Sequence, residues 1–386
     1  MIKELYLPEI SIPRRLRAIK NFIALGLLAS VSVSWRLWIS DRDFPLVPVF
    51  DGLTPLPVPA DKILFGLFLF CTVMLLFARR PRFSIAIVLL IGAYLAIADQ
   101  NRLQPWFYQY MLMLLVLAFY NWRVDEPKDH TAIFTTLKII VAAIYFWSGI
   151  QKLNPNFMAD TWPWLIKPLE SIFTPEGCTV ILKSGYGIPF IEIFIGIALF
   201  SASAKRIAIP LAIGMHLLIL ILMGPFGHNY NPVIWGWNLG MVFMIYFLFA
   251  GTADSKYHSV SYLFSFKPAY IILLLCGLMP GLNLVNKWDS YLSASLYSGN
   301  TSNGIIYLSD NARSRLPYYL QSFTKPEGNK QNSLNIKQWA MHELQVPGYP
   351  EKRIFEAVEK YIGRITCCDD EVSLFYKDKW NILADN

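Results

Sequence analysis

The chain has 386 residues, of which 55% are hydrophobic and only 16% are charged, and its mean hydropathy is +0.40. Soluble globular proteins carry about 25% charged residues, so this composition excludes an ordinary soluble protein and predicts one that crosses a membrane several times. The net charge of +7 arises before residue 286, because residues 286–386 carry 12 acidic and 12 basic side chains. The positive charge therefore indicates membrane topology and not nucleic-acid binding.

Nine apolar stretches approach the length that a helix needs to cross a bilayer, about 17 to 25 residues. The first follows basic residues, as in a signal peptide, but it continues through the apolar run Trp35–Trp38. We therefore expect it to be retained as a span. The sixth is the shortest. The nine stretches are residues 20–39, 62–78, 83–98, 106–121, 133–150, 189–202, 207–224, 233–250 and 268–285.

Basic residues in the connecting loops predict the orientation of the chain. They lie before the first stretch and after the second, fourth, sixth and eighth, at Arg14, Arg15, Arg17, Lys20, Arg79, Arg80, Arg82, Arg123, Lys128, Lys205, Arg206, Lys256 and Lys267. All of them fall on one side if nine helices cross and the N-terminus is cytoplasmic. We therefore expect a multi-pass protein of the plasma (inner) membrane whose C-terminus lies outside the cytoplasm.

The C-terminal hundred residues differ from the rest in composition. Residues 305–308 and 372–376 are typical of short strands, and residues 336–344 and 351–362 are typical of helices. In the second of these helices Ile354, Phe355, Val358 and Ile362 share one face. The fold class we expect is an all-α polytopic membrane domain, residues 1–285, followed by a small extracytoplasmic α/β or α+β domain, residues 286–386.

Polar residues are concentrated at the outer ends of the predicted spans. Ionisable groups inside a bilayer are costly, which makes each one a functional candidate. Lys152 ends the fifth span, Glu192 lies near the start of the sixth, and His216 lies within the seventh, roughly 12 Å deep at 1.5 Å per residue. We interpret these three as catalytic groups in an outward-opening cavity. The candidate substrate-binding residues around them are Asp99, Arg102, Gln104, Gln109, Trp147, Asn154, His228, Asn229, Asn231 and Asn238.

Several of these residues also have simpler interpretations. Lys152 is equally typical of an anchor whose ammonium reaches the headgroups, and Glu192 and His216 are compatible with structural contacts between helices. Tryptophans near helix ends, among them Trp106 and Trp147, are typical of an interfacial belt. Two further alternatives stay open: residues 162–173 form a lip over the cavity or only shield helix ends, and Cys178 either pairs with Cys367 or Cys368 or remains a free thiol.

The fifth span ends in YFWSGIQKLNPNF, residues 145–157. This stretch resembles the signature of the HTTM family, the membrane domain of vitamin K-dependent gamma-carboxylases and their bacterial relatives. The nine-span layout with the C-terminus outside is similar to that of the carboxylase. The resemblance covers residues 15–285 and implies that Lys152 is the base that deprotonates a reduced quinone of the vitamin K type.

The chain departs from the carboxylase pattern in three places. Gln151 stands where the carboxylase has a second lysine, and the end of the fourth span, AFYNWRVDE, lacks the carboxylase histidine. The part outside the membrane is also much smaller. The resemblance therefore implies a bacterial-type relative in which the scaffold and the lysine serve another substrate.

Two classes of function follow. The first is an enzyme in which Lys152, assisted by His216 and Glu192, acts as a general base on a quinol-like or lipidic substrate or modifies a secreted peptide. The second is a non-catalytic maturation, immunity or export partner of a secreted peptide, like the SdpB-like branch of the same family. A transporter is less favoured, because no inverted repeat is evident. The sequence contains no Walker A, His-Glu-x-x-His or Gly-x-Ser-x-Gly motif, and we predict no metal site.

Overall fold

The protein is described here by a computed structural model. It describes residues 10–50, 52–123, 127–251, 266–328 and 331–380. Lys256, one of the basic residues used to predict the orientation, lies outside the described residues.

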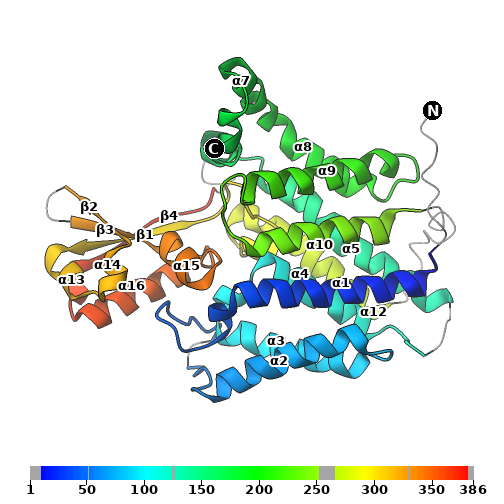
Figure 1. Cartoon of the computed structure of the whole chain (residues 1–386), viewed down its shortest axis with the longest axis horizontal. Helices are drawn as coiled ribbons and strands as arrows, with labels where there is room; N and C mark the ends of the chain where they lie inside the picture. Colours follow the sequence, from blue (N-terminus) through cyan, green and yellow to red (C-terminus); the bar gives the residue numbers. More distant parts are fainter. Residues whose placement is uncertain (1–9, 51, 124–126, 252–265, 329–330, 381–386) are drawn as a thin grey trace.

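Long apolar helices form a bundle that makes up most of the molecule, and they run side by side along its length (Figure 1). Leucine, isoleucine, valine and phenylalanine dominate them, as expected for helices surrounded by lipid. Short helices α6 (Trp162–Ile166) and α7 (Pro175–Ser184) connect α5 to α8. The helices of the bundle are α1 (Ile12–Val33), α2 (Ala60–Phe77), α3 (Arg82–Ala98), α4 (Pro105–Ala118), α5 (Pro127–Gln151), α8 (Ile188–Ala198), α9 (Lys205–Met223), α10 (Val233–Phe249) and α12 (Lys267–Ile272), the last continuing in tighter and wider turns to Val285.

The predicted spans coincide with these helices. Among the residues that the structure describes, six helical stretches have at least 18 residues and are apolar enough to cross a membrane, and three shorter apolar helices, α3, α4 and α10, occupy the remaining predicted positions. The sixth predicted span, residues 189–202, starts earlier than expected, because α7 and α8 form a continuous helical stretch from Pro175 to Ala198. The chain is therefore a multi-pass membrane protein.

Basic side chains gather at one end of the bundle, which we call the basic end. Lys20, in the first half of α1, donates to the carbonyls of Leu75 and Ala78 at the end of α2. Lys205, at the start of α9, donates to the carbonyl of Gly251 just beyond α10 at 3.3 Å. The opposite end contacts the C-terminal domain, and we call it the domain-side end (Figure 1). Lys20 and Lys205, two of the basic residues used to predict the orientation, therefore lie at the same end of the bundle.

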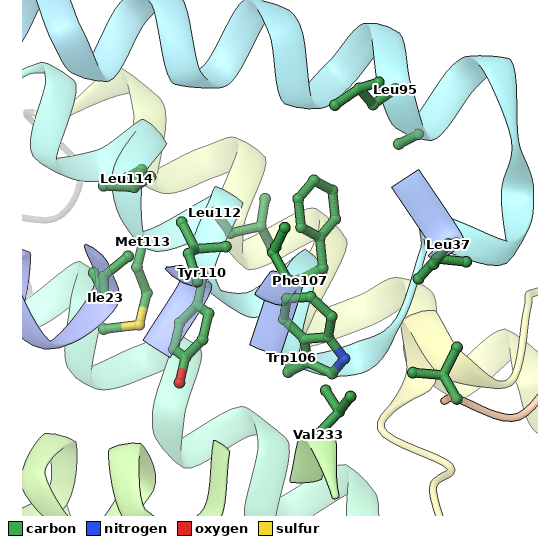
Figure 2. Packing of buried hydrophobic residues seen from close by; sticks show 14 of the residues in the cluster. Ile23, Leu37, Leu95, Trp106, Phe107, Tyr110, Leu112, Met113, Leu114 and Val233 are labelled. Atoms are coloured by element: carbon green, nitrogen blue, oxygen red, sulfur yellow. The ribbon is translucent and has the colours of Figure 1, made fainter. Parts of the chain in front are cut away.

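Aromatic residues of α4 form the centre of the bundle core. Trp106, Phe107 and Tyr110 are each at most 2% exposed and point among side chains of α1, α3 and α10, including Ile23, Leu95 and Val233 (Figure 2). The prediction of an interfacial belt position is therefore wrong for Trp106. Its indole is covered because the short helix α4 is surrounded by other helices.

The C-terminal domain is an antiparallel sheet with helices packed against it, so of the two predicted alternatives, α/β and α+β, the structure follows α+β. The strands are β1 (Asn303–Ser309), β2 (Thr324–Glu327), β3 (Gln331–Asn335) and β4 (Val372–Lys377). Their order is β2-β3-β1-β4, with Ile306 of β1 opposite both Leu334 of β3 and Leu374 of β4. The helices are α13 (Asp310–Arg315), α14 (Tyr318–Gln321), α15 (Ile336–Leu344) and α16 (Lys352–Thr366).

The predicted elements of this domain are present, and two strands were missed. The apolar face of α16, formed by Ile354, Phe355, Val358 and Ile362, is buried as predicted. β2 and β3 were missed because their sequences, TKPE and QNSLN, contain almost no apolar alternation. The five cysteines are free thiols, so the structure follows the free-thiol alternative for Cys178, Cys367 and Cys368.

Candidate functional site

Glycines on α5 and α8 bring these two helices into close contact. A Cβ atom added to Gly149 would lie 2.5 Å from the carbonyl oxygen of Pro189, and one added to Gly196 would lie 2.7 Å from the backbone nitrogen of Phe146. Small residues allow such close backbone approach between membrane helices. The contact places the C-terminal end of α5 beside the first turns of α8, and these two segments carry the candidate acid–base residues.

Substituting Gly149 with alanine should lower the free energy of unfolding by about 1–3 kcal/mol, because the added methyl group overpacks the interface. Gly214→Ala on α9 is the matched control, since nothing lies within 4 Å of its added Cβ and alanine is favoured over glycine in a helix by roughly 0.5–1 kcal/mol. Denaturation of the purified proteins in detergent would compare the two. Equal stability of Gly149→Ala and wild type would show that α5 and α8 do not depend on this close approach.

Lys152 and Glu192 form a buried ion pair at this contact. The Nζ of Lys152 lies 2.8 Å from Oε2 of Glu192 and 2.6 Å from Oγ of Ser148, one turn back on α5. The two side chains are only 9% and 6% exposed. Lys152 therefore does not extend its ammonium to solvent as an anchor would, and the contact fixes its position between two helices.

His216 forms a second polar group on the neighbouring helices. Its Nδ1 lies 2.6 Å from Oδ1 of Asn238, and its Nε2 lies 2.5 Å from the hydroxyl of Tyr145. The amide nitrogen of Asn238 donates to the carbonyl of Ile234 at 2.8 Å, which directs Oδ1 toward the imidazole. In a neutral imidazole Nδ1 then carries the proton, and Nε2 accepts from Tyr145.

Both polar groups face one cavity inside the bundle. It encloses about 1340 Å³ counting its open side, and its wall is predominantly apolar. Gln109, Trp147 and Trp237 also line it, and Nε1 of Trp237 donates to Oε1 of Gln109 at 2.7 Å. Of the thirteen candidate residues, six line this cavity: Lys152, Glu192, His216, Gln109, Trp147 and Asn238. An apolar chamber with a few converging polar groups is the usual form of a small-molecule site.

A serine-rich segment, residues 290–300, closes the domain-side end of the cavity, and we call it the roof. Tyr291, Leu296 and Tyr297 of the roof line the cavity. Hydrogen bonds within the roof hold its shape: Oγ of Ser295 lies 2.6 Å from Oγ of Ser298 and donates to the carbonyl of Asn300 at 2.7 Å. Nothing in the apolar pattern of the sequence indicated this segment.

The end of α5 fastens the roof to the bundle. Oε1 of Gln151 accepts from Asn300 at 2.8 Å and from Asn283 at 2.9 Å, and its amide donates to the carbonyl of Pro280 at 3.1 Å. Asn154 donates to the carbonyl of Ser298 at 2.8 Å. Asn154 thus supports the roof of the cavity and does not form its wall, and Gln151 has the same function.

Replacing Gln151 with leucine should loosen the roof, because the amide groups of Asn283 and Asn300 lose their shared acceptor inside the protein. Each buried polar group left unsatisfied costs about 1–3 kcal/mol. Hydrogen exchange at residues 295–302 should accelerate, while exchange in the sheet of the C-terminal domain should stay as in wild type. Unchanged protection of residues 295–302 in Gln151→Leu would contradict this role.

Asp99, Arg102 and Gln104 lie elsewhere, at the junction of the bundle with the C-terminal domain, and they do not line the cavity. Asp99 pairs with Arg42 and lies 3.9 Å from Nε of Arg102. Gln104 donates to the carbonyl of Pro347 at 3.1 Å. The sequence places these residues at the correct end of the bundle but cannot show that the C-terminal domain covers this turn.

His228, Asn229 and Asn231 form the turn between α9 and α10 and do not line the cavity either. His228 stacks on Trp164 with the ring centroids 4.3 Å apart. Asn229 and Asn231 have φ of 47° and 52°, a left-handed conformation that asparagine tolerates better than most residues. Asn231 donates to the hydroxyl of Tyr297 at 3.2 Å. The turn therefore holds the roof and the α6 segment in place.

The segment that contains α6, residues 162–166, forms part of the cavity wall. This agrees with the first of the two predicted alternatives, in which residues 162–173 form a lip over the cavity. Trp162 and Leu165 line the cavity, and Trp162 is 4% exposed. Nε1 of Trp162 donates to the carbonyls of Ile181 and Leu182, which ties the segment to α7. Tyr145 and Ser148 were not singled out from the sequence, although both lie in the quoted motif, two turns and one turn before Lys152 respectively.

The bundle and its cavity define a multi-pass membrane protein with a largely apolar site that holds a few polar groups. A family model described as the HTTM domain matches residues 19–225, which is more than half of the chain, and the chain therefore belongs to the HTTM family. The match includes Lys152, Glu192 and His216 and ends before α10. No curated protein and no solved structure matched the chain.

Proposed function

We propose that the cavity is the active site of a carboxylase-like membrane enzyme, in which Lys152 acts as a general base toward a quinol-like or lipidic substrate. The observation that carries this proposal is that Lys152, Glu192 and His216 face one largely apolar cavity, which measures about 1340 Å³ when its open side is counted. A substrate with a ring and an apolar tail matches such a wall, and its hydroxyl would meet the polar groups. A reduced quinone of the vitamin K type would supply that acidic hydroxyl.

The ion pair provides a route for the proton. Lys152 must give up its ammonium proton before it can act as a base, and the carboxylate of Glu192, 2.8 Å from its Nζ, is the acceptor within reach. The neutral amine then accepts a proton from the substrate hydroxyl. The pair gains one proton in total, and the resulting ammonium lies beside the oxygen that lost it.

We further propose that the C-terminal domain and the site face outward across the plasma membrane. The basic end of the bundle carries Lys20, Lys205 and their neighbours, and cytoplasmic loops are enriched in such residues. All nine apolar helices of the described part of the chain, including the three short ones, then cross the bilayer. Cysteine labelling with a membrane-impermeant maleimide in intact cells should reach Cys367, which is exposed, and labelling only after lysis would reverse the orientation.

The experiment that tests the enzyme proposal is mass spectrometry of small molecules that co-purify with the protein. Wild type should retain a quinone or a distinctive lipid, and Lys152→Ala should lose it. Lys167→Ala, at an exposed lysine in the turn that follows α6, is the control and should retain it. Lys152→Arg keeps the charge but cannot act as a base, so catalytic activity that survives Lys152→Arg would eliminate the general-base role.

A second candidate is a non-catalytic partner of a secreted peptide, and one observation favours it. A groove of about 1210 Å³, counting its open side, separates the C-terminal domain from the α6 segment and is lined by Lys337 and Lys377. Lys337 is exposed and forms no ion pair within the described part of the chain. Loss of peptide capture in Lys337→Gln, but not in Lys360→Gln, would support this candidate.

A further inference from the structure

A small hollow lies where the end of α1 meets the C-terminal domain, and we call it the junction hollow. It measures about 470 Å³ counting its open side. The bundle contributes the residues at the end of α1 and just after it. The domain contributes the last turn of α15, which packs against the turn Trp35–Trp38 beyond α1 (Figure 1). The lining residues are Val33, Trp35, Arg36, His342, Glu343 and Gln345.

The junction hollow lies at the level of the lipid headgroups. Arg36 follows Arg17, near the start of α1, by 19 residues, about 29 Å at 1.5 Å per residue, and the hydrocarbon core of a bilayer is about 30 Å thick. Trp35 is 50% exposed, and tryptophan is enriched at this depth. Leu25 and Val33, on one face of α1, are 50% and 39% exposed. Acyl chains cover that face, so the hollow lies where their headgroups begin.

Arg36 supplies an unpaired positive charge to the junction hollow. Its side chain is exposed and forms no ion pair with a residue that the structure describes. Its guanidinium carbon lies 5.4 Å from the ring centre of Trp35, a cation–π contact that leaves the N–H donors free. Every other described cation at the domain-side ends of α1 to α5 has a carboxylate partner. These paired cations are Arg42, Lys62, Arg102 and Lys152. Arg36 is therefore available to an anion, and at this depth the abundant anion is a lipid phosphate.

The opposite wall of the junction hollow is negative. α15 ends there, and the partial negative charge of a helix C-terminus favours a cation. Glu343 adds a full charge, although its buried carboxylate already accepts from two backbone nitrogens and from the indole of Trp339. The carbonyls of the last turn have no partner inside the helix, and the amide of Gln345 satisfies one of them, that of His342, at 3.0 Å. The hollow therefore has a positive wall and a negative wall that do not neutralise each other.

We propose that the junction hollow binds the headgroup of one phosphatidylethanolamine from the leaflet on the domain side. This headgroup carries a phosphate next to the glycerol and a primary ammonium beyond it. Arg36, at the end of the membrane helix, binds the phosphate, and the last turn of α15, farther from the bilayer, binds the ammonium. The order of the two charges along the headgroup is thus the order of the two walls. The inference goes beyond the proposed function, because it uses no residue of the cavity and holds for either orientation of the protein.

The negative wall distinguishes ethanolamine from the other common headgroups. A primary ammonium donates three hydrogen bonds, which the carbonyls at the end of α15 accept, whereas the trimethylated amine of choline donates none. Phosphatidylglycerol has no cationic group and carries a net negative charge, which the charge of Glu343 repels. A bound phosphatidylethanolamine therefore connects α1 to α15 and helps to hold the C-terminal domain on the bundle.

Native mass spectrometry of the delipidated, full-length protein tests the headgroup with three lipids of identical acyl chains. Phosphatidylethanolamine should bind about threefold or more tightly than phosphatidylcholine or phosphatidylglycerol, because only its ammonium gains hydrogen bonds. Successive N-methylation of the ethanolamine should weaken binding at each step, since each methyl group removes a donor. Equal affinity for the three lipids, or tighter binding of phosphatidylglycerol, would overturn the proposed headgroup.

The variant Arg36→Gln tests the place of binding. Because Arg36 is exposed and unpaired, this variant should fold and unfold like wild type, and its thermal unfolding checks that it does. Its affinity for phosphatidylethanolamine should fall about tenfold, which corresponds to about 1.4 kcal/mol. Arg80→Gln is the matched control, at an exposed arginine of the turn between α2 and α3 at the basic end, and it should bind like wild type. Unchanged affinity in Arg36→Gln would show that the lipid does not lie in the junction hollow.

A soluble competitor separates a membrane lipid from a free phosphate ester. Glycerophosphoethanolamine has the same two charges but no acyl chains to lie along Leu25 and Val33. It should displace the bound lipid only at concentrations higher by on the order of a hundredfold, because burial of acyl groups contributes much of the binding free energy. Equal potency of the soluble ester would mean that the junction hollow is a site for a free phosphate ester, and it would overturn the assignment to a membrane lipid.

Discussion

Replacing Lys152 with methionine should lower the free energy of unfolding by about 3–5 kcal/mol, because it leaves the buried carboxylate of Glu192 without its partner. The pair is joined at 2.8 Å, and both side chains are under 10% exposed. Methionine keeps much of the apolar stem of lysine, so the loss comes from the charge and not from a cavity. Unfolding in mixed micelles, followed by tryptophan fluorescence, would measure it.

The double variant Lys152→Met with Glu192→Met separates the ion pair from other effects. Replacing both partners of a buried pair with apolar residues is often neutral or stabilising, so the double variant should recover most of the stability lost by the single one. It should nevertheless be inactive. A double variant as unstable as Lys152→Met would mean that the pair is not the source of the loss and that Lys152 has another structural contact.

Replacing Asp99 with alanine should cost a comparable amount, about 3–5 kcal/mol, because it leaves two buried arginines uncompensated. Asp99 is fully buried, pairs with Arg42, and accepts from the backbone of Val47 at 3.2 Å and from the amide of Asn101 at 2.9 Å. Asn101 in turn accepts from the backbone nitrogen of Tyr349 at 3.1 Å. The loss should therefore also loosen the C-terminal domain.

Asp41→Ala is the matched control for Asp99→Ala. Asp41 pairs with Lys62 at 3.0 Å, but the two side chains are 66% and 45% exposed, and exposed pairs contribute about 0–1 kcal/mol. Limited proteolysis between residues 286 and 302 would report whether the C-terminal domain has loosened. If Asp99→Ala and Asp41→Ala unfold alike, the junction is not held by Asp99.

The fold of the bundle was largely predictable, because membrane spans depend on apolar length and on the distribution of basic residues. The helix 336–344 and the apolar face of α16 were likewise predicted correctly, since amphipathic periodicity determines which side packs on a sheet. The strands β2 and β3 were not predictable, because Asn332 and Ser333 are buried by their neighbours and not by their own polarity. Trp106 was predicted to lie at the membrane–water interface because the sequence of α4 does not show which other helices surround it.

The candidate site was predicted in part. Lys152, Glu192 and His216 were found because an ionisable side chain inside an apolar span is costly however the helices pack. The position of each residue within its predicted span was therefore enough to identify it as a candidate. Asp99 and Arg102 were assigned to the same cavity because depth does not distinguish a chamber from a domain junction. The roof was missed because its polar residues are held by contacts between distant segments of the chain: Asn300 donates to Gln151, and Asn154 donates to the carbonyl of Ser298.

The most direct test of the central claim is the ionisation of a phenol bound in the cavity. An alkyl-tailed nitrophenol would be added to the purified protein at a pH below its own pKa, where the free phenol is neutral, and its absorption spectrum recorded. If Lys152 and Glu192 accept a proton from a bound hydroxyl, the bound phenol should show the spectrum of its anion in wild type and of its neutral form in the Lys152→Met, Glu192→Met double variant. A phenol that binds wild type with the neutral spectrum would contradict the account.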